Sequence, residues 1–487
     1  MAILEVLARR VAERGEHVFV RFDGRALSYR DFDACSNAAA HALQAAGVVK
    51  GDRVTLALGS SLEFVVAAFA ALKAGAILNP INPTLGDTEI GWVLGHAEPR
   101  VVVTDAESDE TMRRLDQPTM LATALAAGDD TTPVDVLVGE NDYSTLLYTS
   151  GTTGRPKGVL FTHGRTGTSG PHFIEAMELS QDDIILAVTP LFHGNAWGSV
   201  VTALFAGATS VFTRAFHGSQ FWQLVHDARA TVLYTLGTVL AMLLTREPTD
   251  LERENPLRII LGLGSAPIRD RVIERFGVRD VLECFGSTDA GVVTITPRGA
   301  PARAGSCGPA VSGVRLKIVD DAGTELPVGA VGEIAVHSPG RVASYFRDEE
   351  ATTQAVRDGW FHTGDLGYLD EDGWLYFVDR KRDVIRRGGE NVSSVLVEKT
   401  LREHPRVLEA AVIGVPEPVL GQEIKACLVT SEPVSEDDVR AFAAARLANF
   451  QVPRLWEFRD SLPKTPTQRV EKYKLRQEHD RGKPLLR

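Results

Sequence analysis

A segment rich in glycine and hydroxyl side chains, at residues 148–158, most clearly indicates chemistry in this chain. The segment is Tyr148-Thr149-Ser150-Gly151-Thr152-Thr153-Gly154-Arg155-Pro156-Lys157-Gly158. Glycines let the backbone approach a ligand closely, hydroxyls donate hydrogen bonds, and Lys157 adds a positive charge, so such a loop can wrap a polyphosphate. The spacing differs from G-x-x-x-x-G-K-[ST], because no Ser or Thr follows Lys157. A Walker-type nucleotide hydrolase is therefore disfavoured.

Six further short segments follow this loop along the chain. They are Pro190-Leu191-Phe192-His193, Gly264-Ser265-Ala266-Pro267, Phe285-Gly286-Ser287-Thr288-Asp289, Trp360-Phe361-His362-Thr363-Gly364-Asp365, Asp379-Arg380-Lys381-Arg382-Asp383 and Arg387-Gly388-Gly389-Glu390-Asn391. Together with the loop, and in the same order, they resemble the motifs of the adenylate-forming superfamily, which includes acyl-CoA synthetases, amino-acid-adenylating domains and firefly-type luciferases. The resemblance covers the whole chain. It implies an acid–thiol ligase that makes an acyl-CoA thioester through an acyl-adenylate, with ATP, coenzyme A and Mg²⁺.

The resemblance implies a nucleotide site. Asp365 corresponds to the carboxylate that binds both ribose hydroxyls, and Arg380 to a basic residue beside the ribose. Thr288 is similar to the threonine near the α-phosphate, and Asp289 stands where the family has a Mg²⁺-binding glutamate, which is one methylene longer. The nucleotide-binding residues predicted in this way are Thr149, Ser150, Gly151, Thr152, Thr153, Gly154, Lys157, Ser265, Ala266, Pro267, Phe285, Gly286, Ser287, Asp365 and Arg380.

The same resemblance implies sites for the thiol and the acid. His193 resembles the side chain that gates the path between the acyl pocket and the thiol channel. Arg382 matches the hinge on which the small domain turns, and Gly388 and Gly389 resemble the lining of the pantetheine tunnel. The predicted acyl-pocket residues are Asn195, Trp197, Tyr234, Gly237, Gly262, Gly264 and Cys284. Because three of them are glycines, we expect room for a bulky hydrophobic acid.

Residues 463–472 depart from the family pattern. They are similar to its P-K-T-P-T-G-K-[IV] segment, but Gln468 replaces the glycine and Arg469 replaces the lysine. That lysine bridges the substrate carboxylate and the α-phosphate during attack on ATP, and the planar guanidinium of arginine does not reproduce a compact ammonium. The other departure, Asp289, also falls on the adenylation half-reaction. We therefore expect weak adenylation, so that the acyl-adenylate comes from elsewhere, such as a separate adenylating enzyme. The predicted catalytic residues are His193, Thr288, Asp289 and Arg469, with Asp289 as the metal ligand.

Three alternatives stay open. The first is an ordinary two-step ATP-dependent acyl-CoA synthetase, in which Arg469, Lys464 or Lys472 supplies the missing charge. A non-catalytic adenylate binder is disfavoured, because Asp365 and Arg380 match the family. An enzyme that loads the phosphopantetheine arm of a carrier protein differs only in its thiol acceptor, so comparing free CoA with a carrier protein distinguishes the two.

The elements that must position these residues follow from the apolar patterns. Strand-like runs alternate with helical patterns through the first four fifths of the chain, which is typical of parallel sheets covered by helices. We expect an α/β fold with a large N-terminal domain at 1–379, containing parallel or mixed sheets and a β-barrel-like subdomain. A hinge at 380–383 and a small mobile α+β domain at 384–487 complete the prediction. The apolar stretch 64–78, broken by Lys73 and Gly75, predicts a buried helix that leads into a strand.

The composition excludes several function classes. The 487 residues have a formal net charge of −12, so a nucleic-acid binder and a protein held on anionic membranes by a basic surface are disfavoured. The four cysteines contain no C-x-x-C pair, which argues against a disulfide framework or a thiolate zinc site. The N-terminus does not resemble a signal peptide, and no apolar run is long enough for a membrane span. A reducing cytoplasm is the expected location.

Overall fold

The chain divides into two units. In the computed structural model, the described residues are 2–125, 128–149, 156–301, 303–381, 383–387, 390–417, 419–465 and 470–481. The first unit combines Met1–Arg315 with Val336–Phe361, and the second combines Leu316–Ala335 with His362–Arg487. Each unit thus contains segments that are far apart in the sequence.

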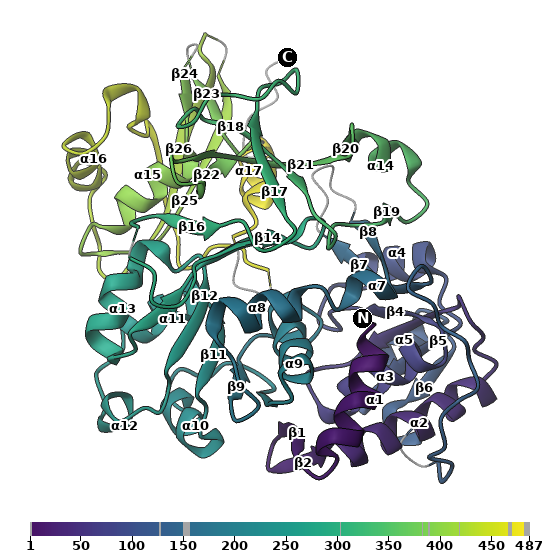
Figure 1. Ribbon diagram of the computed structural model, residues 1–487. Helices are drawn as coiled ribbons and strands as arrows, with labels where there is room; N and C mark the ends of the chain where they lie inside the picture. Colours follow the sequence, from purple (N-terminus) through teal and green to yellow (C-terminus); the bar gives the residue numbers. More distant parts are fainter. Residues whose placement is uncertain are drawn as a thin grey trace. The chain divides into compact units, whose positions relative to one another are not determined.

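One sheet of the first unit carries the arms of the phosphate loop (Figure 1). Its strand order is β19-β8-β7-β4-β3-β5-β6. The strands are β3 (Arg53–Ala57), β4 (Ile77–Pro80), β5 (Val101–Thr104), β6 (Thr119–Leu121), β7 (Tyr143–Thr149), β8 (Lys157–Thr162) and β19 (Ser344–Tyr345). The strands from β6 to β7 run parallel, and β8 is antiparallel to β7 and β19. The helices that precede or connect these strands are α2 (Tyr29–Ala45), α3 (Leu62–Lys73), α4 (Asp87–Ala97), α5 (Ala106–Arg114) and α6 (Ala122–Leu125).

The stretch 64–78 forms most of helix α3 and the first two residues of strand β4. Ser61 caps the helix by accepting a hydrogen bond from the Phe64 N–H at 3.1 Å. All but two of its twelve residues are buried. The predicted buried helix that leads into a strand is confirmed.

The second sheet of the first unit is almost entirely parallel. Its order is β13-β12-β11-β9-β10-β1-β2, and only β2 is antiparallel to its neighbour. The strands are β1 (Val18–Phe22), β2 (Arg25–Ser28), β9 (Ile184–Ala187), β10 (Thr209–Phe212), β11 (Val232–Leu236), β12 (Ile259–Leu263) and β13 (Asp280–Leu282). The antiparallel hairpin of β14 (Cys284–Ser287) and β15 (Gly291–Ile295) follows β13.

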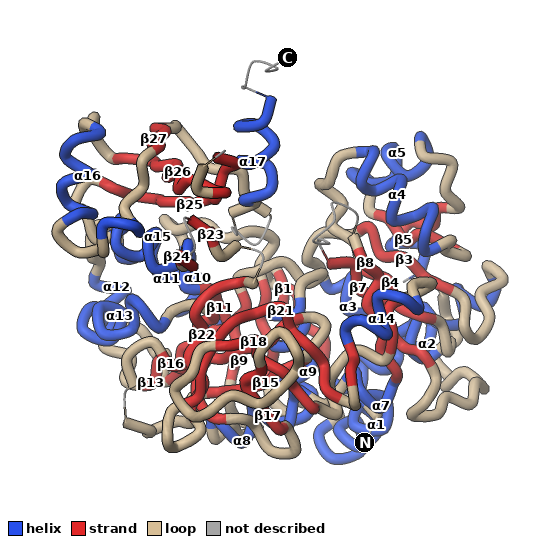
Figure 2. Tube along the Cα trace, turned by 90° about the horizontal axis from the view of Figure 1, so that it is seen from above, coloured by secondary structure: helices blue, strands red, loops and turns tan. Residues whose placement is uncertain are grey.

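Helices cover both faces of this second sheet (Figure 2). Tyr234 of β11 belongs to a core that includes residues of α8 (Ser169–Met177) and α9 (Gly194–Ala206). Its neighbour Leu233 belongs to a core with α10 (Phe221–Ala228), α11 (Gly237–Leu244) and α13 (Arg269–Phe276). Successive strand residues point to opposite faces, so both faces must be covered. Other elements of the first unit are α1 (Ile3–Arg14), α7 (His163–Thr166), α12 (Asp250–Arg253), η1 (Ala266–Ile268), β16 (Ser306–Pro309), α14 (Glu349–Ala355) and β20 (Val356–Arg357).

The second unit contains most of one sheet and all of another. In the partly included sheet, the strands of this region have the order β22-β21-β18-β17. They are β17 (Arg315–Val319), β18 (Gly332–His337), β21 (Trp360–Leu369) and β22 (Trp374–Arg380). The sheet that lies wholly in the second unit has the order β24-β23-β26-β25, with β27 beside β26. Its elements are β23 (Ile385–Arg387), β24 (Glu390–Val392), α15 (Ser394–Arg402), β25 (Val407–Glu417), β26 (Gly421–Thr430), α16 (Glu436–Ala444), η2 (Asn449–Gln451), β27 (Leu455–Phe458) and α17 (Lys472–Arg481).

The predicted fold class is confirmed by this arrangement of helix-covered parallel and mixed sheets with a C-terminal α+β region. The hinge at 380–383 and the domain boundaries around it stay predictions. Among the helices described, none is both long and apolar enough to cross a membrane.

Candidate functional site

The arms of the predicted phosphate loop form an antiparallel hairpin. Thr149, the last residue of β7, pairs with Lys157, the first residue of β8. The predicted residues Ser150, Gly151, Thr152, Thr153 and Gly154 lie outside the described residues. At Gly158, a Cβ atom would lie 2.9 Å from Leu146 Cδ1, so a larger residue would displace the Leu146 side chain. The described arms therefore bring Lys157 to the loop's base.

Lys157 lies over the ring of Tyr345, and Tyr345 in turn hydrogen-bonds to Asp289. Its Nζ is 5.1 Å from the ring centroid of Tyr345 in β19. Burial raises the pKa of Tyr345 above its ordinary range, and the charge and hydrogen bond of the Asp289 carboxylate add to this shift. Thr288 and Asp289 lie in the turn between β14 and β15. A cation and a carboxylate thus both contact Tyr345.

The predicted adenine segment forms a turn after β12. Gly264 has a φ of +78°, in the left-handed region that favours glycine. Ser265 is buried, and Ala266 and Pro267 begin the short helix η1. Phe285 is buried in β14, and Ser287 accepts a hydrogen bond from the Ala290 N–H at 3.0 Å. At Gly286 a Cβ would lie 2.5 Å from the Gly291 carbonyl oxygen. The register of the hairpin therefore depends on this glycine.

Glu283 was missed by the sequence reasoning, yet it contacts this turn directly. Its carboxylate accepts hydrogen bonds from the N–H groups of Gly264 and Ala266, both at 2.8 Å. Burial raises its pKa to about 7, against the lowering effect of its backbone hydrogen bonds. The available signal was an acidic residue between the apolar residues Leu282 and Cys284, since charged side chains are rarely buried without partners.

The predicted acyl-pocket residues lie on several elements of the first unit. Tyr234 belongs to β11, Gly262 to β12 and Cys284 to β14, while Trp197 belongs to α9. The Tyr234 hydroxyl donates to Thr202 Oγ1 at 3.1 Å. The Trp197 ring is 5.9 Å from the Phe69 ring.

Each of the three glycines in this set has a structural reason other than pocket size. At Gly237 a Cβ would lie 2.2 Å from the Gly264 carbonyl oxygen, and at Gly262 it would lie 2.9 Å from Ser265 Cβ. Both glycines permit close packing of the turn. At Gly264 a Cβ would meet open space, but the φ of +78° by itself favours glycine there. The bulky hydrophobic acid therefore stays a prediction, and the glycines support it less than their number suggested.

His193 and Asn195 lie at the N-terminus of α9. The His193 carbonyl accepts a hydrogen bond from the Trp197 N–H at 3.0 Å. Burial lowers the pKa of His193 to about 4, so the imidazole is neutral at physiological pH. Asn195 Oδ1 accepts a hydrogen bond from Thr189 at 2.9 Å. A neutral, compact ring here is compatible with the predicted gate.

The predicted ribose-binding residues are brought together in the second unit. Asp365 of β21 pairs in register with Arg380 of β22, and Arg380 Nε is 3.5 Å from Asp365 Oδ1. Glu333 accepts a hydrogen bond from the Gly364 N–H at 3.1 Å and contacts Lys381 Nζ at 3.1 Å. The carboxylate and guanidinium are thus adjacent, and their role in ribose binding stays a prediction.

Several predicted residues of the C-terminal region lie outside the described residues. They are Arg382, Gly388, Gly389, Gln468 and Arg469. The two nearby lysines are described. Lys464 forms an ion pair with Glu409 at 2.5 Å, and Lys472 forms one with Glu398 at 2.7 Å. Both lysines are therefore engaged within the second unit.

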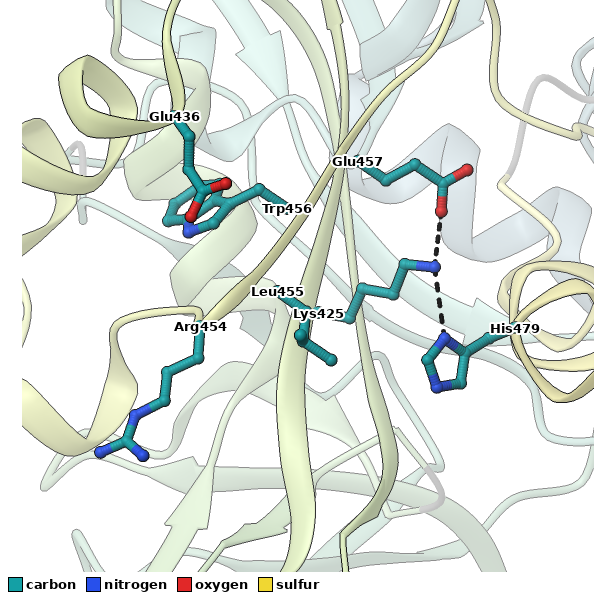
Figure 3. A pocket seen from close by; sticks show the side chains of 7 residues that line it. All are labelled: Lys425, Glu436, Arg454, Leu455, Trp456, Glu457 and His479. Atoms are coloured by element: carbon teal, nitrogen blue, oxygen red, sulfur yellow. Dashed lines mark hydrogen bonds and ion pairs between the residues drawn. The ribbon is translucent and has the colours of Figure 1, made fainter. Parts of the chain in front are cut away.

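A cavity of about 300 Å³ lies elsewhere in the second unit. Figure 3 shows Lys425 between Glu457 and His479, with Arg454, Leu455, Trp456 and Glu436 completing the lining. Lys425 Nζ is 2.5 Å from the Glu457 carboxylate. None of the predicted site residues lines this cavity. No group of three or more potential metal ligands occurs among the described residues.

Comparison with known proteins identifies the class. The model of the AMP-binding enzyme family matches residues 7–346, and that of the AMP-binding enzyme C-terminal domain matches residues 396–469. The chain belongs to this family and is an acid–thiol ligase of the adenylate-forming superfamily. It is 33% identical over 484 residues to a crotonobetaine/carnitine–CoA ligase of Salmonella typhi, covering 93% of each chain. It is 34% identical to the enzyme of the same name from Escherichia coli O8 (strain IAI1), covering 90% of each.

Solved structures agree with this placement. ATP-bound MatB from Rhodopseudomonas palustris superposes with a TM-score of 0.90 at 28% identity, covering 98% of this chain and 99% of that one. The anthranilate CoA ligase AuaEII in complex with anthranoyl-AMP gives a TM-score of 0.91 at 26% identity, with coverage of 99% and 97%. The predicted family and enzyme class are confirmed.

Proposed function

We propose that this enzyme forms an acyl-CoA thioester from an acyl-adenylate and CoA, and that its own ATP-dependent adenylation is impaired. The observation that carries the proposal is the pair Gln468–Arg469 in the segment where the family has glycine and lysine. CoA as acceptor is supported by the similar CoA ligases. ATP as a ligand is supported by the similar ATP-bound structure.

Contacts of the neighbouring lysines support impairment. The side chain of Lys472 is only 14% exposed, and it donates a hydrogen bond to Ser394 Oγ at 2.6 Å besides its ion pair with Glu398. Releasing it would leave the Glu398 carboxylate, itself 10% exposed, without this charge partner. Lys464 would have to leave Glu409. Each lysine would thus have to break its ion pair before it could replace the family's lysine. Arg469 is therefore the residue left to bridge the substrate carboxylate and the α-phosphate.

Asp289 supports the same conclusion. A carboxylate suits Mg²⁺, which would be held by Asp289 together with phosphate oxygens and would neutralise phosphate charge. The aspartate is one methylene shorter than the family's glutamate, and Tyr345 hydrogen-bonds to it. Both features restrict its reach toward a metal, and adenylation is the half-reaction that handles the polyphosphate.

The thioester half-reaction requires different groups. Asp365 and Arg380 would hold the ribose, His193 would gate the thiol path, and the segment with Gly388 and Gly389 would admit pantetheine. The CoA thiol then loses its proton to solvent, and its sulfur attacks the acyl carbonyl carbon. The bond from that carbon to the AMP phosphate oxygen breaks, and AMP leaves with the negative charge on that oxygen. A separate adenylating enzyme would supply the adenylate. The acid is proposed to be bulky and hydrophobic, and the open space beside Gly264 supports room for it.

Separate assay of the two half-reactions tests the proposal. The substrates are benzoate, anthranilate and longer aliphatic acids, each with its synthetic adenylate. The wild-type enzyme should show little acid-dependent exchange of pyrophosphate into ATP, but should convert a supplied adenylate and CoA to thioester. Arg469→Lys combined with Gln468→Gly should raise exchange by about tenfold or more.

The matched control is Lys464→Arg, which keeps the charge and should leave exchange unchanged. Brisk exchange by the wild-type enzyme with an acid that it also converts to thioester would establish an ordinary two-step synthetase. Transfer to a phosphopantetheine-bearing carrier protein instead of CoA would establish a carrier-protein loader.

A further inference from the structure

We infer that Glu283 is a positioning residue that fixes the turn of Gly264, Ser265 and Ala266 for adenylate binding. The inference rests on the proposed function, because it takes this turn to be part of the site that binds the acyl-adenylate. The residue lies between β13 and β14 and is 4% exposed.

The carboxylate of Glu283 accepts four hydrogen bonds from neutral donors. Oε1 accepts from the Gly264 N–H at 2.8 Å and from the Cys284 N–H at 3.1 Å. Oε2 accepts from the Ala266 N–H at 2.8 Å and from Ser265 Oγ at 3.4 Å. Three of these donors belong to the turn, and the fourth lies next to Phe285. One side chain therefore joins two segments of the proposed site.

The turn needs this external acceptor. Its own backbone satisfies the Ser265 N–H, which donates to the Gly262 carbonyl at 3.1 Å. The N–H groups of Gly264 and Ala266 instead point to the carboxylate. On another side, the Gly264 carbonyl approaches Gly237 so closely that a Cβ there would lie 2.2 Å from it. The turn is thus held between the Gly237 backbone and the Glu283 carboxylate.

The chemistry of the donors explains why a carboxylate is required. Both oxygens of an ionised carboxylate only accept, so each can face N–H groups. Glutamine has nearly the same shape, but its amide NH₂ would face either the Gly264 and Cys284 donors or the Ala266 and Ser265 donors. Buried N–H groups without acceptors are costly. A glutamine side chain of nearly the same shape would therefore not preserve the conformation of the turn.

Binding of AMP tests the inference. Glu283→Gln and Glu283→Ala should both weaken AMP affinity roughly ten- to a hundredfold. The KM for a supplied adenylate should rise similarly, while the KM for CoA changes little. Measurements at pH 8 keep Glu283 ionised. Glu252→Gln is the control, because Glu252 is also buried in the first unit but pairs with Arg275 at 2.8 Å. It should lower stability and leave AMP affinity unchanged.

Wild-type AMP affinity and adenylate KM in Glu283→Gln would overturn the inference. If these variants do not fold, hydrogen exchange of the wild-type enzyme decides: the Gly264 and Ala266 amides should be protected without ligand, and rapid exchange would overturn the inference. A wild-type enzyme that binds neither AMP nor adenylate would refute the proposed function instead. Brisk pyrophosphate exchange would refute only impaired adenylation, since AMP binding is common to both readings of the enzyme.

Discussion

At Asp289, the proposed impairment of adenylation depends on a single methylene. Its carboxylate hydrogen-bonds to Tyr345, and Lys157 lies over the same tyrosine ring. A polyphosphate is present in the adenylation step only, whereas the adenylate carries a single phosphate. Weaker binding of Mg²⁺ at Asp289 should therefore slow adenylation more than thioester formation.

Restoring the glutamate should strengthen adenylation. Asp289→Glu, added to Arg469→Lys and Gln468→Gly, should raise pyrophosphate exchange further, because the longer arm extends the reach toward Mg²⁺. The gain should not be the product of the separate gains, since the groups act in one transition state. Exchange rates of the single, double and triple variants measure this coupling. No gain from Asp289→Glu would show that aspartate suffices at this position.

His193 should make stability depend on pH. Burial lowers its pKa in the folded state to about 4, from the ordinary value of 6.5. Its contribution to the free energy of unfolding is therefore fully present above pH 6.5 and is lost as the pH falls toward 4. Relative to His193→Gln, the wild-type protein should lose up to about 3 kcal/mol over this range. Denaturant titrations at pH 7 and pH 4.5 measure the difference, and an equal loss in both proteins would contradict it.

Between elements, the packing of α11 against the turn after β12 depends on backbone contact. Gly237→Ala should lower the free energy of unfolding by roughly 2–3 kcal/mol, because its Cβ would overlap the Gly264 carbonyl oxygen. Gly95→Ala is the control, since Gly95 is exposed in α4 and its Cβ would meet nothing within 4 Å. It should stabilise by about 0.5–1 kcal/mol. Urea denaturation compares the two, and a Gly237→Ala protein as stable as wild type would refute the contact.

The start of α15 depends on a carboxylate from β22. Asp379 accepts hydrogen bonds from the Ser394 N–H at 2.6 Å and from Ser394 Oγ at 2.9 Å, and both residues are buried. Asp379→Ala should cost about 1–3 kcal/mol, because it leaves buried donors without an acceptor. The control is Asp105→Ala at the N-cap of α5, with an expected cost of about 1 kcal/mol. Equal losses in the free energy of unfolding for the two variants would mean that burial adds nothing to the hydrogen bonds of Asp379.

Across the whole molecule, the two units should respond separately to damage. Lys472→Met removes the charge that faces Glu398 and Ser394, and breaking such a buried pair costs about 3–5 kcal/mol. Hydrogen exchange should accelerate in β25 and β26 while β9 and β11 keep their protection. Lys474→Met, whose partner Glu471 forms an exposed pair with it, should change exchange little. Uniform acceleration through both units would show that they unfold together.

The sequence by itself determined the class of enzyme and the fold class. Motifs such as the phosphate loop and the segment ending at Asp365 are local, so their residue types and order are visible without coordinates. Apolar periodicity is local as well, which is why the helix of 62–73 and the strand after it could be predicted. The substitution at Arg469 is likewise a property of the sequence.

Tertiary structure decided the partners of individual side chains. Lys472 and Ser394 are 78 residues apart, and nothing in the local pattern pairs them. Glu283 is buried against a turn of another strand, and Gly237 is small because a distant carbonyl approaches it. Such contacts depend on which strands become neighbours in the sheet, and that is fixed only when the whole chain packs.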